Sequence, residues 1–449
     1  MTGIGFNLAS KTISVEEALS KIKSGDSIVS ALAAAEASGI LGQLHTIADR
    51  VRDVRVATCL PMGAYPYYMD PAMKGHFHHD AWFFSPAVRK AHDEAGTTSF
   101  VPNHLHRAGL DRLYFARPTV FLGSCTPPDS RGYVSISLSA TYEREMMQAA
   151  DLVILEINEA TPFTFGDTIV HVDEVDYFVN NTHALPELAI VPVGERDRKI
   201  GAYIAEHIED GSTIQLGIGG IPNAVASALL DKKNLSIHTE MFTDGMVDLY
   251  NAGCIGTEAH MYGSHRHRKI LTGKMVCTFA LGTKKLYDFI DRNPAVAVMR
   301  GCWVNDPYTM GSNKKSVSIN TSLEVDLTGQ VCSESIGTKQ FSGTGGQADT
   351  AIGAQMSENG KSFIALYSTA EVKQPDGTKK TISKITPTLA LGAAVTLHRS
   401  NVDHVVTEYG IVRLKGCPLK ERAKRLISIA HPDFRAWLEE EAARIGFTK

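Results

Sequence analysis

A glycine-rich segment at residues 215–223 is the feature of the sequence that most directly suggests chemistry. It reads Gln-Leu-Gly-Ile-Gly-Gly-Ile-Pro-Asn and stands between an apolar run and a run with helical spacing. The glycines, Gly217, Gly219 and Gly220, allow close backbone approach, and N–H groups at a helix start can bind an anion or a developing oxyanion. A tight strand-to-helix turn without a ligand explains the same pattern. Pro222 excludes a dinucleotide fingerprint, because it stands where the third glycine is needed.

A glutamate follows the next apolar run along the chain. Residues 235–237 are predicted to form a strand, and Glu240 comes three residues after that strand ends. In a parallel sheet Glu240 would emerge at the same edge as the glycine segment. A carboxylate that faces backbone N–H donors supplies a nucleophile and an oxyanion hole, which are the two parts of acyl transfer. A solvated or capping glutamate at a strand end is the alternative.

A second glycine run occupies residues 343–347 and reads Gly-Thr-Gly-Gly-Gln. With Ala348 after it, the run can be interpreted as a degenerate dinucleotide loop. However, the preceding residues 339–342 are mostly polar and Asp349 follows at once, so a buried strand does not lead into it. This context disfavours NAD binding.

Two histidine-rich clusters invite a metal interpretation. His76, His78, His79 and Asp80 stand close together, but structural zinc sites usually take their ligands from separated pairs. Local packing or an exposed loop is therefore favoured, and no metal is expected. The run at residues 265–268, His-Arg-His-Arg, forms the densest cationic stretch of the chain together with Lys269, and a solvated loop is the favoured explanation for it.

The elements that must position these residues occur twice along the chain. Three patterns recur in the same order: a helix that runs into a strand, an Asp-x-x-Gly turn before a β-branched strand, and a buried strand that ends in a glutamate. They lie at residues 13–35, 129–135 and 151–156 in the first half, and at residues 200–218, 326–332 and 403–408 in the second. Such a series indicates an internal duplication.

Short apolar strands that alternate with amphipathic helices are typical of parallel sheets covered on both faces. We therefore predict an α/β protein with two tandem, similar open α/β/α domains and mainly parallel sheets. The first domain is expected to span residues 1–194, and the second residues 195–449, which include Glu240. Ligands of such sheets bind at the carboxyl ends of the strands.

The composition is globular and excludes several classes of function. Of the 449 residues 43% are hydrophobic, and 45 basic against 49 acidic residues give a net charge of −4. This balance provides no general attraction for nucleic acid or for anionic lipid. The apolar stretches are too short for a membrane span and the N-terminus resembles no secretory signal, so a cytoplasmic protein is expected. The seven scattered cysteines form no C-x-x-C pair, which argues against a zinc ribbon or a disulfide framework.

Five longer motifs together carry a resemblance to a known family. The sequence resembles the acetyl-CoA hydrolase/transferase family, and within it the class I CoA-transferases that act on 4-hydroxybutyrate or butyrate with acetate. The resemblance covers nearly the whole chain, and the motifs lie at residues 217–222, 237–241, 244–249, 282–287 and 337–347.

The resemblance implies an acyl-CoA:carboxylate CoA-transferase in which Glu240 is the covalent nucleophile and passes through a glutamyl-CoA thioester. Coenzyme A is then a co-substrate, and no prosthetic group or metal is implied. The implied site lies in the cleft between the domains of a homodimeric enzyme. Gly217, Gly219 and Gly220 would donate backbone N–H groups. The other implied contacts are Gly217, Ile218, Gly343, Gly345, Gly346 and Gln347 for CoA, and Gln215, Asn158 and Met241 for the substrate.

Three other functions share features with this sequence. A hydrolase, in which water discharges the same glutamyl ester, would use the same glutamate and glycines. A binding protein that kept the fold without the activity is disfavoured by the intact motifs around Gly217 and Glu240. An NAD-dependent oxidoreductase lacks its glycine fingerprint. The cationic run at residues 265–268 could contact the phosphates of CoA.

Overall fold

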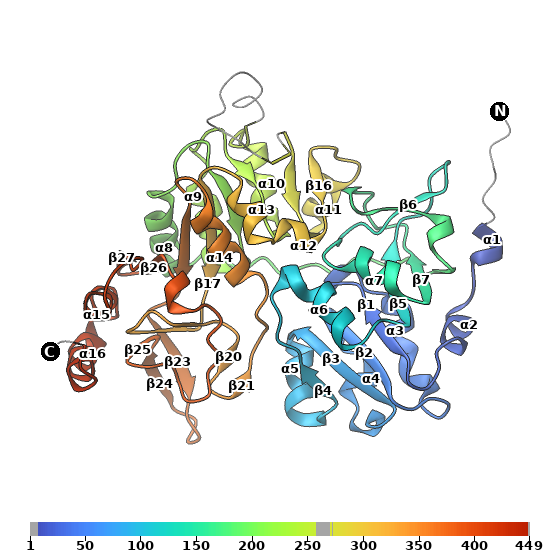
Figure 1. Ribbon diagram of the computed structural model, residues 1–449, viewed down its shortest axis with the longest axis horizontal. Coiled ribbons are helices and arrows are strands. Elements are labelled where there is room, and N and C mark those ends of the chain that lie inside the picture. Colours follow the sequence, from blue (N-terminus) through green and yellow to red (C-terminus); the bar gives the residue numbers. More distant parts are fainter. Residues whose placement is uncertain (1–7, 257–269, 272, 448–449) are drawn as a thin grey trace. The chain divides into compact units, whose positions relative to one another are not determined.

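The computed structural model describes residues 8–256, 270–271 and 273–447, and these form two compact units of mixed α/β structure (Figure 1). Unit 1 comprises Met1–Ala189, Glu240–Asp244 and Lys274–Asn305, and unit 2 comprises Ile190–Thr239, Gly245–Gly273 and Asp306–Lys449. Each unit is built on its own large sheet. The prediction of an α/β fold with mainly parallel sheets is confirmed.

Unit 1 contains a seven-stranded sheet in the order β10-β7-β5-β1-β2-β3-β4, in which every pair is parallel. The central strands are almost wholly buried, as their continuous apolar runs require. The strands are β1 (Ser27–Ser30), β2 (Val54–Cys59), β3 (Phe77–Phe83), β4 (Thr98–Phe100), β5 (Val120–Cys125), β7 (Leu152–Ile157) and β10 (Tyr177–Asn180).

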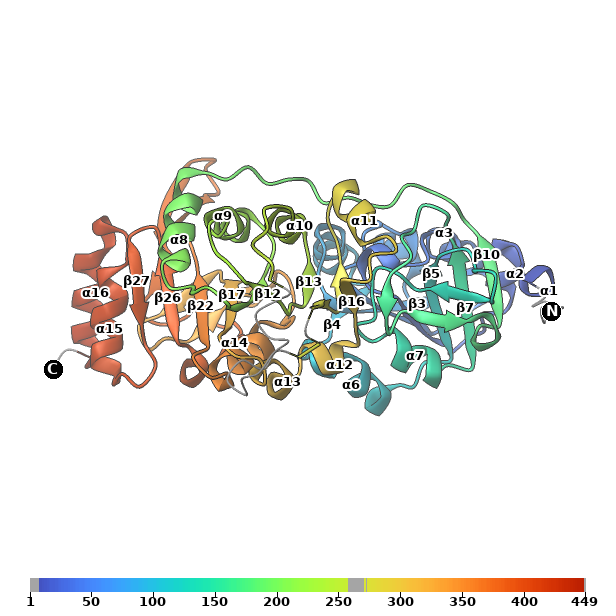
Figure 2. The same cartoon turned by 90° about the horizontal axis from the view of Figure 1, so that it is seen from above.

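Helices lie on both faces of this sheet, with α3 and α7 on opposite sides in Figure 2. One core packs Leu19, Ile40 and Leu44 of the helical layer against Ile28 and Val56 of the sheet. The helices of unit 1 are α1 (Leu8–Lys11), α2 (Val15–Ser20), α3 (Ser38–Gln43), α4 (Pro66–Met69), α5 (Pro86–Lys90), α6 (Ala108–Phe115), α7 (Glu143–Ala149), α11 (Lys284–Ile290) and α12 (Gly301–Val304).

Unit 2 contains a six-stranded sheet in the order β12-β11-β17-β22-β26-β27. Its first five strands are parallel, and the edge strand β27 is antiparallel to β26. The strands are β11 (Thr213–Leu216), β12 (Ser236–Ile237), β17 (Ser316–Thr321), β22 (Lys361–Ala365), β26 (His404–Thr407) and β27 (Gly410–Arg413).

The core of unit 2 joins apolar side chains of its sheet, such as Ile364 and Val405, to those of the C-terminal helices, such as Leu426 and Leu438. Its helices are α8 (Glu195–Ala205), α9 (Gly220–Ala228), α13 (Pro307–Gly311), α14 (Gln347–Met356), α15 (Leu419–Ser428) and α16 (Pro432–Arg444), while α10 (Asp244–Asn251) begins at the last residue of a unit 1 segment. Short accessory strands are β18 (Glu324–Asp326), β19 (Val331–Cys332), β20 (Ser335–Ile336), β21 (Lys339–Gln340), β23 (Thr369–Lys373), β24 (Lys379–Ser383) and β25 (Ile385–Thr386).

The Asp-x-x-Gly turn has the same hydrogen bonds in both units. Asp129 Oδ1 accepts from the N–H groups of Arg131 and Tyr133, at 2.8 and 2.9 Å. Asp326 Oδ1 accepts in the same way from the N–H groups two and four residues later, at 2.9 and 3.0 Å. These matching bonds support the predicted duplication.

The strand that ends in a glutamate is a poorer match. By sheet position β1, β5 and β7 of unit 1 correspond to β11, β17 and β22 of unit 2. Glu156 lies on β7, whereas Glu408 follows β26, which is one strand further from β11. The two glutamates therefore do not occupy equivalent positions, although both follow similar apolar runs.

The two compact units of the structure do not coincide with the predicted domains, which meet between residues 194 and 195. The chain enters unit 2 at Ile190 and returns to unit 1 for Glu240–Asp244 and Lys274–Asn305. Main-chain bonds explain this return, since Thr278 O accepts from Ala140 N at 2.9 Å and Ala280 N donates to Leu138 O at 2.8 Å. The segments form β13 (Met241–Phe242), β14 (Met275–Cys277), β15 (Phe279–Ala280) and β16 (Val296–Val298), and the remaining strands of unit 1 are β6 (Tyr133–Ser135), β8 (Phe165–Gly166) and β9 (Ile169–His171).

Across the described residues, no helix is both long enough and apolar enough to cross a membrane.

Candidate active site

The first glycine turn joins β11 to α9 in unit 2, as predicted. Gly219 has φ +112° and ψ −176°, a conformation that residues with a Cβ rarely adopt. Helix α9 begins at Gly220, so the first N–H groups of the helix have no partner within it. A Cβ on Gly220 would lie 2.9 Å from Asp197 Oδ1, which explains the glycine there. Strand β11 has β12 on one side and β17 on the other, so the strand order reverses at β11. The turn that follows β11 therefore lies where open parallel sheets bind their ligands.

The second glycine turn precedes α14 and lies at the same edge of the unit 2 sheet. Gly345 has φ +57°, and Gly346 caps the helix that begins at Gln347. The Gln347 side chain donates from Nε2 to Thr321 O at 3.0 Å, at the carboxyl end of β17. Since β17 pairs with β11, two helix N-termini approach one sheet edge. The short strand β21 before this turn is not buried, so the dinucleotide interpretation remains disfavoured.

A polar network joins β17 to α14, the helix that follows the second glycine turn. Ser318 Oγ donates to Thr350 Oγ1 at 2.9 Å, and Asn320 Nδ2 lies 2.9 Å from Ser318 Oγ. Gln215 Oε1 accepts from Ile319 N at 3.2 Å. The predicted substrate residue Gln215 thus ties β11 to β17 through its amide oxygen.

Glu240 lies in unit 1, directly before β13, and is half-buried. Its carbonyl oxygen accepts from the N–H groups of Thr278 and Phe279, at 2.9 and 3.2 Å. Its carboxylate oxygen Oε2 accepts from Asn305 Nδ2 at 2.8 Å. The main chain and the side chain of Glu240 are therefore both held by named partners.

Asn305 is the contact that the sequence did not reveal. It follows α12, is fully buried, and its Oδ1 has no hydrogen-bond partner within the described residues. It is 65 residues from Glu240 along the chain, so neither spacing nor periodicity linked the two.

Cys59, the last residue of β2, has a thiol whose pKa is influenced by the charge of Glu240. Burial raises the pKa of the Cys59 thiol well above its usual value, and the charges of Glu240 and Glu143 add to this. A thiol held neutral in this way is a poor nucleophile at physiological pH.

Two predicted substrate residues have other contacts in the structure. Asn158 is fully buried: its Oδ1 accepts from Ala160 N at 3.0 Å and its Nδ2 donates to His183 O at 3.0 Å. These bonds close the loop after β7, and a substrate contact would require that loop to open. Met241 is buried in β13, whereas Ile218, predicted to contact CoA, is 47% exposed.

The histidines at residues 76–79 are separated by the alternation of β3. His79 is buried with its ring nitrogens 2.8 Å from Thr58 Oγ1 and 3.0 Å from Thr98 Oγ1, and burial lowers its pKa to about 3. His78 points the other way and lies 3.2 Å from Asp53 Oδ1. His76 contacts Val51 O from the turn before the strand.

Asp80 joins two arginines, with Arg55 Nη1 at 2.7 Å and Arg112 Nη1 at 2.9 Å. Among the residues that the structure describes, no group of three or more His, Cys, Asp or Glu side chains could hold a metal ion. The histidines and arginines at residues 265–268 lie outside the described residues.

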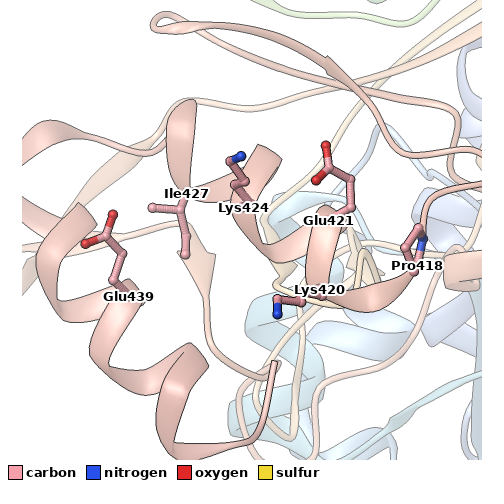
Figure 3. A pocket seen from close by; sticks show the side chains of 6 residues that line it. All are labelled: Pro418, Lys420, Glu421, Lys424, Ile427 and Glu439. Atoms are coloured by element: carbon pink, nitrogen blue, oxygen red, sulfur yellow. The ribbon is translucent and has the colours of Figure 1, made fainter. Parts of the chain in front are cut away.

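Two hollows lie away from these residues. One, of about 630 Å³, is an open groove between α15 and α16 whose lining mixes Lys420 and Lys424 with Glu421 and Glu439 (Figure 3). The other, of about 440 Å³ in unit 1, is lined by the loops after β5 and β7 and the end of α11. None of the predicted site residues lines either hollow.

Comparison with known proteins identifies the family. The model of the acetyl-CoA hydrolase/transferase N-terminal domain matches residues 7–192, and that of the C-terminal domain matches residues 282–442. Succinyl-CoA:cyclohexane-1-carboxylate CoA transferase of Geobacter metallireducens is 41% identical over 442 residues, which cover 97% of this chain and 96% of that protein. The 4-hydroxybutyrate coenzyme A transferase of Clostridium kluyveri is 41% identical over 432 residues, or 96% of this chain and 97% of that protein.

Other comparisons agree. The crystal structure of RipA from Yersinia pestis matches with a TM-score of 0.87 and 30% identity, over 98% of both chains. In contrast, an acetyl-CoA hydrolase of Candida albicans is 26% identical over 68% of this chain and 61% of that protein. The chain therefore belongs to the acetyl-CoA hydrolase/transferase family, as its motifs predicted.

Proposed function

We propose that this CoA-transferase moves coenzyme A between a short-chain acyl-CoA and acetate or a similar carboxylate, through a glutamyl-CoA thioester on Glu240. The acyl group is acetyl, propionyl, butyryl or 4-hydroxybutyryl. Relatives at 41% identity are named for CoA transfer to or from a carboxylate, which supports this class of substrates. The hydrolase named above is a more distant relative.

The observation that carries the proposal is the setting of the Glu240 carboxylate. It is half-buried, its backbone is fixed by two N–H donors, and Asn305 donates to one carboxylate oxygen at 2.8 Å. A hydrogen bond from an uncharged donor orients a carboxylate while leaving it ionised, as a nucleophile must be.

The proposed reaction proceeds by two exchanges at carbonyl carbons. The Glu240 carboxylate attacks the thioester carbon, a C–O bond forms, the C–S bond breaks, and CoA leaves as its thiolate. That thiolate then attacks the glutamyl carbonyl carbon of the mixed anhydride, which releases the acyl group as a carboxylate. A second carboxylate reverses both steps and leaves as its own CoA ester. No proton or electron is gained or lost overall, and no prosthetic group is needed.

The two glycine turns keep their predicted roles in this proposal. Gly217, Gly219 and Gly220 are proposed to donate backbone N–H groups to the developing oxyanion, and Gly343–Gln347 to line the path of CoA. Helix N-termini favour negative charge, and the turns lead into α9 and α14. Contacts of Gln215, Asn158 and Met241 with the substrate stay predictions, as does the homodimer.

The test is an assay of acyl-CoA donors against carboxylate acceptors, with free CoA and the new acyl-CoA measured together. A transferase forms new acyl-CoA in proportion to acceptor and releases little free CoA. A hydrolase, the alternative, releases free CoA at the same rate with or without acceptor. Parallel double-reciprocal lines would support the covalent intermediate, and intersecting lines would contradict it.

A further inference from the structure

Glu36 of unit 1 is a buried glutamate for which the proposed reaction has no role. It is 5% exposed and follows the 3₁₀ turn η1 (Ala33–Ala35), which comes after β1. Strand β1 stands where the order of the unit 1 sheet reverses, with β2 on one side and β5 on the other. Glu36 therefore lies at the edge where such sheets bind ligands.

The carboxyl group of Glu36 holds the loop that follows β2. Its Oε1 accepts three hydrogen bonds, from Met62 N at 3.1 Å, from Gly63 N at 3.0 Å and from the Tyr65 hydroxyl at 2.6 Å. Its Oε2 is buried and has no hydrogen-bond partner within the described part of the chain. One oxygen thus fixes the loop, and the other is left in an apolar setting.

Both loops joined by this carboxyl group have strained backbones. Ala33 has φ +50° and Leu60 has φ +51°, values that residues with a Cβ rarely adopt. Gly63 approaches the Tyr65 ring so closely that a Cβ would lie 2.3 Å from it. Such conformations persist only where neighbouring contacts enforce them, and the three bonds to Oε1 are contacts of that kind.

The loop begins next to a residue whose thiol is influenced by the charge of Glu240. Cys59 ends β2, directly before the strained Leu60, and the charge of Glu240 contributes to the raised pKa of its thiol. Cys59 is also near Glu143, whose Oε1 accepts from Leu32 N at 2.9 Å, directly before η1. A movement of the loop would therefore displace Cys59 and so change the surroundings of Glu240.

We propose that Glu36 is a positioning residue for the transfer reaction, whose carboxyl group holds residues 60–65 and, through them, the position of Cys59 in the surroundings of Glu240. This inference rests on the proposed function of Glu240. Glu36 does not touch the reacting atoms; it acts through the loop.

The protonation state of Glu36 controls this contact. Burial raises its pKa to about 8, against the lowering effect of the bonds from Tyr65, Gly63 and Met62, and Glu156 adds a further small rise. Below that pH the group is neutral, and the unpartnered Oε2 carries no charge. Above it, a buried anion would have no donor at Oε2, which is costly enough to open the loop.

Burial also raises the pKa of the other titratable groups that face Glu36. They are the hydroxyls of Tyr65, Tyr67, Tyr68 and Tyr142, each with a pKa raised chiefly by burial, and the carboxyl of Glu156, whose pKa burial also raises. Glu156 accepts from Gly39 N, Ile40 N and Asn181 Nδ2, so it has donors for both of its oxygens.

The experiment measures the pH dependence of kcat for CoA transfer in wild type, E36Q, Y65F and Y68F. Wild-type kcat should fall about tenfold per pH unit above about pH 8. E36Q keeps the size and the Oε1 acceptor but cannot ionise, so its alkaline decline should disappear. Y65F removes a bond that lowers the pKa of Glu36, so its decline should shift to higher pH. Y68F removes a bond to Gly63 O in the same loop but leaves all three bonds to Glu36, so kcat can fall while the midpoint of its alkaline decline stays at the wild-type pH.

The proposal is wrong if E36Q declines with the wild-type midpoint, or if Y65F and Y68F have the same midpoint. Hydrogen exchange of the peptide that contains residues 60–65 provides a readout that does not depend on activity. Its protection should fall above about pH 8 in wild type but not in E36Q. If wild type transfers no CoA at any pH, the proposed function fails, while the exchange data still test whether Glu36 holds the loop.

Discussion

Replacement of Asn305 tests whether the geometry around Glu240 is that of a working nucleophile. N305A removes the hydrogen bond at 2.8 Å to the Glu240 carboxylate. A hydrogen bond to a charged group contributes about 1.5–3 kcal/mol, which corresponds to about a 10- to 150-fold loss of kcat/KM. The variant should still fold, because the deleted Oδ1 has no partner within the described residues.

N305D gives a sharper version of the same test. The new carboxylate would lie a hydrogen bond away from Glu240, and two carboxylates so close together retain one shared proton. At low pH that proton restores the bond, and at high pH the two groups repel. The ratio of N305D to wild-type activity should therefore fall as the pH rises.

The assay is the single-turnover formation of the covalent intermediate from acyl-CoA without acceptor, followed by steady-state kcat/KM. N293A is the matched control, since Asn293 bonds to Phe289 O and Ala295 N at the end of α11 and is not part of the proposed site. The reasoning is refuted if N305A stays within about twofold of wild type, or if N293A loses as much activity as N305A.

Four further outcomes are expected. E240Q should abolish transfer with the fold intact, since an amide forms no anhydride, and E240D should lose roughly 100-fold, since its carboxylate is withdrawn by about 1 Å. Mass spectrometry after borohydride or hydroxylamine treatment should place the wild-type intermediate on residues 237–242 rather than on a cysteine. G219A and G220A should lower the urea midpoint more than G217A, because Gly219 has φ +112° and Gly220 abuts Asp197, whereas a Cβ on Gly217 meets nothing closer than 3.9 Å. EDTA should leave activity unchanged, and a loss restored only by Zn²⁺ would contradict this. Burial raises the pKa of Glu36 in the folded protein to about 8. The contribution of this group to the free energy of unfolding is therefore complete below the pKa of the unfolded chain and is lost as the pH rises through about 8. In this pH window the free energy of unfolding should fall less steeply with pH in E36Q than in wild type, by up to about 1.4 kcal/mol per pH unit.

Local sequence patterns predicted the parts of the site that are made locally. A glycine turn between a strand and a helix depends on residues within one short segment, so Gly219 and the start of α9 could be read directly. The repeated Asp-x-x-Gly turns were equally visible, because Asp129 and Asp326 bond to their own next few N–H groups. Features of this kind need no knowledge of the tertiary fold.

Contacts between distant segments were not predictable in this way. Asn305 reaches Glu240 because the chain returns to unit 1 at residues 274–305, and main-chain bonds between strands cause that return. The same return places Glu240 apart from the predicted second domain. The resemblance implied Asn158 as a substrate contact, but the backbone of His183 folds back onto it and bonds to its amide.

The environment of four glutamates of unit 1 supports the proposed nucleophilic role of Glu240 over the three that are more deeply buried. Glu36, Glu143 and Glu156 are at most 5% exposed, and each accepts backbone N–H groups that fix a neighbouring loop. Burial raises the pKa of each, so their charged forms are disfavoured. Glu240 is half-buried, and the bond from Asn305 stabilises its ionised form. A nucleophile must be charged, oriented and reachable together, and among these four glutamates Glu240 alone combines a half-exposed position with a side-chain amide donor.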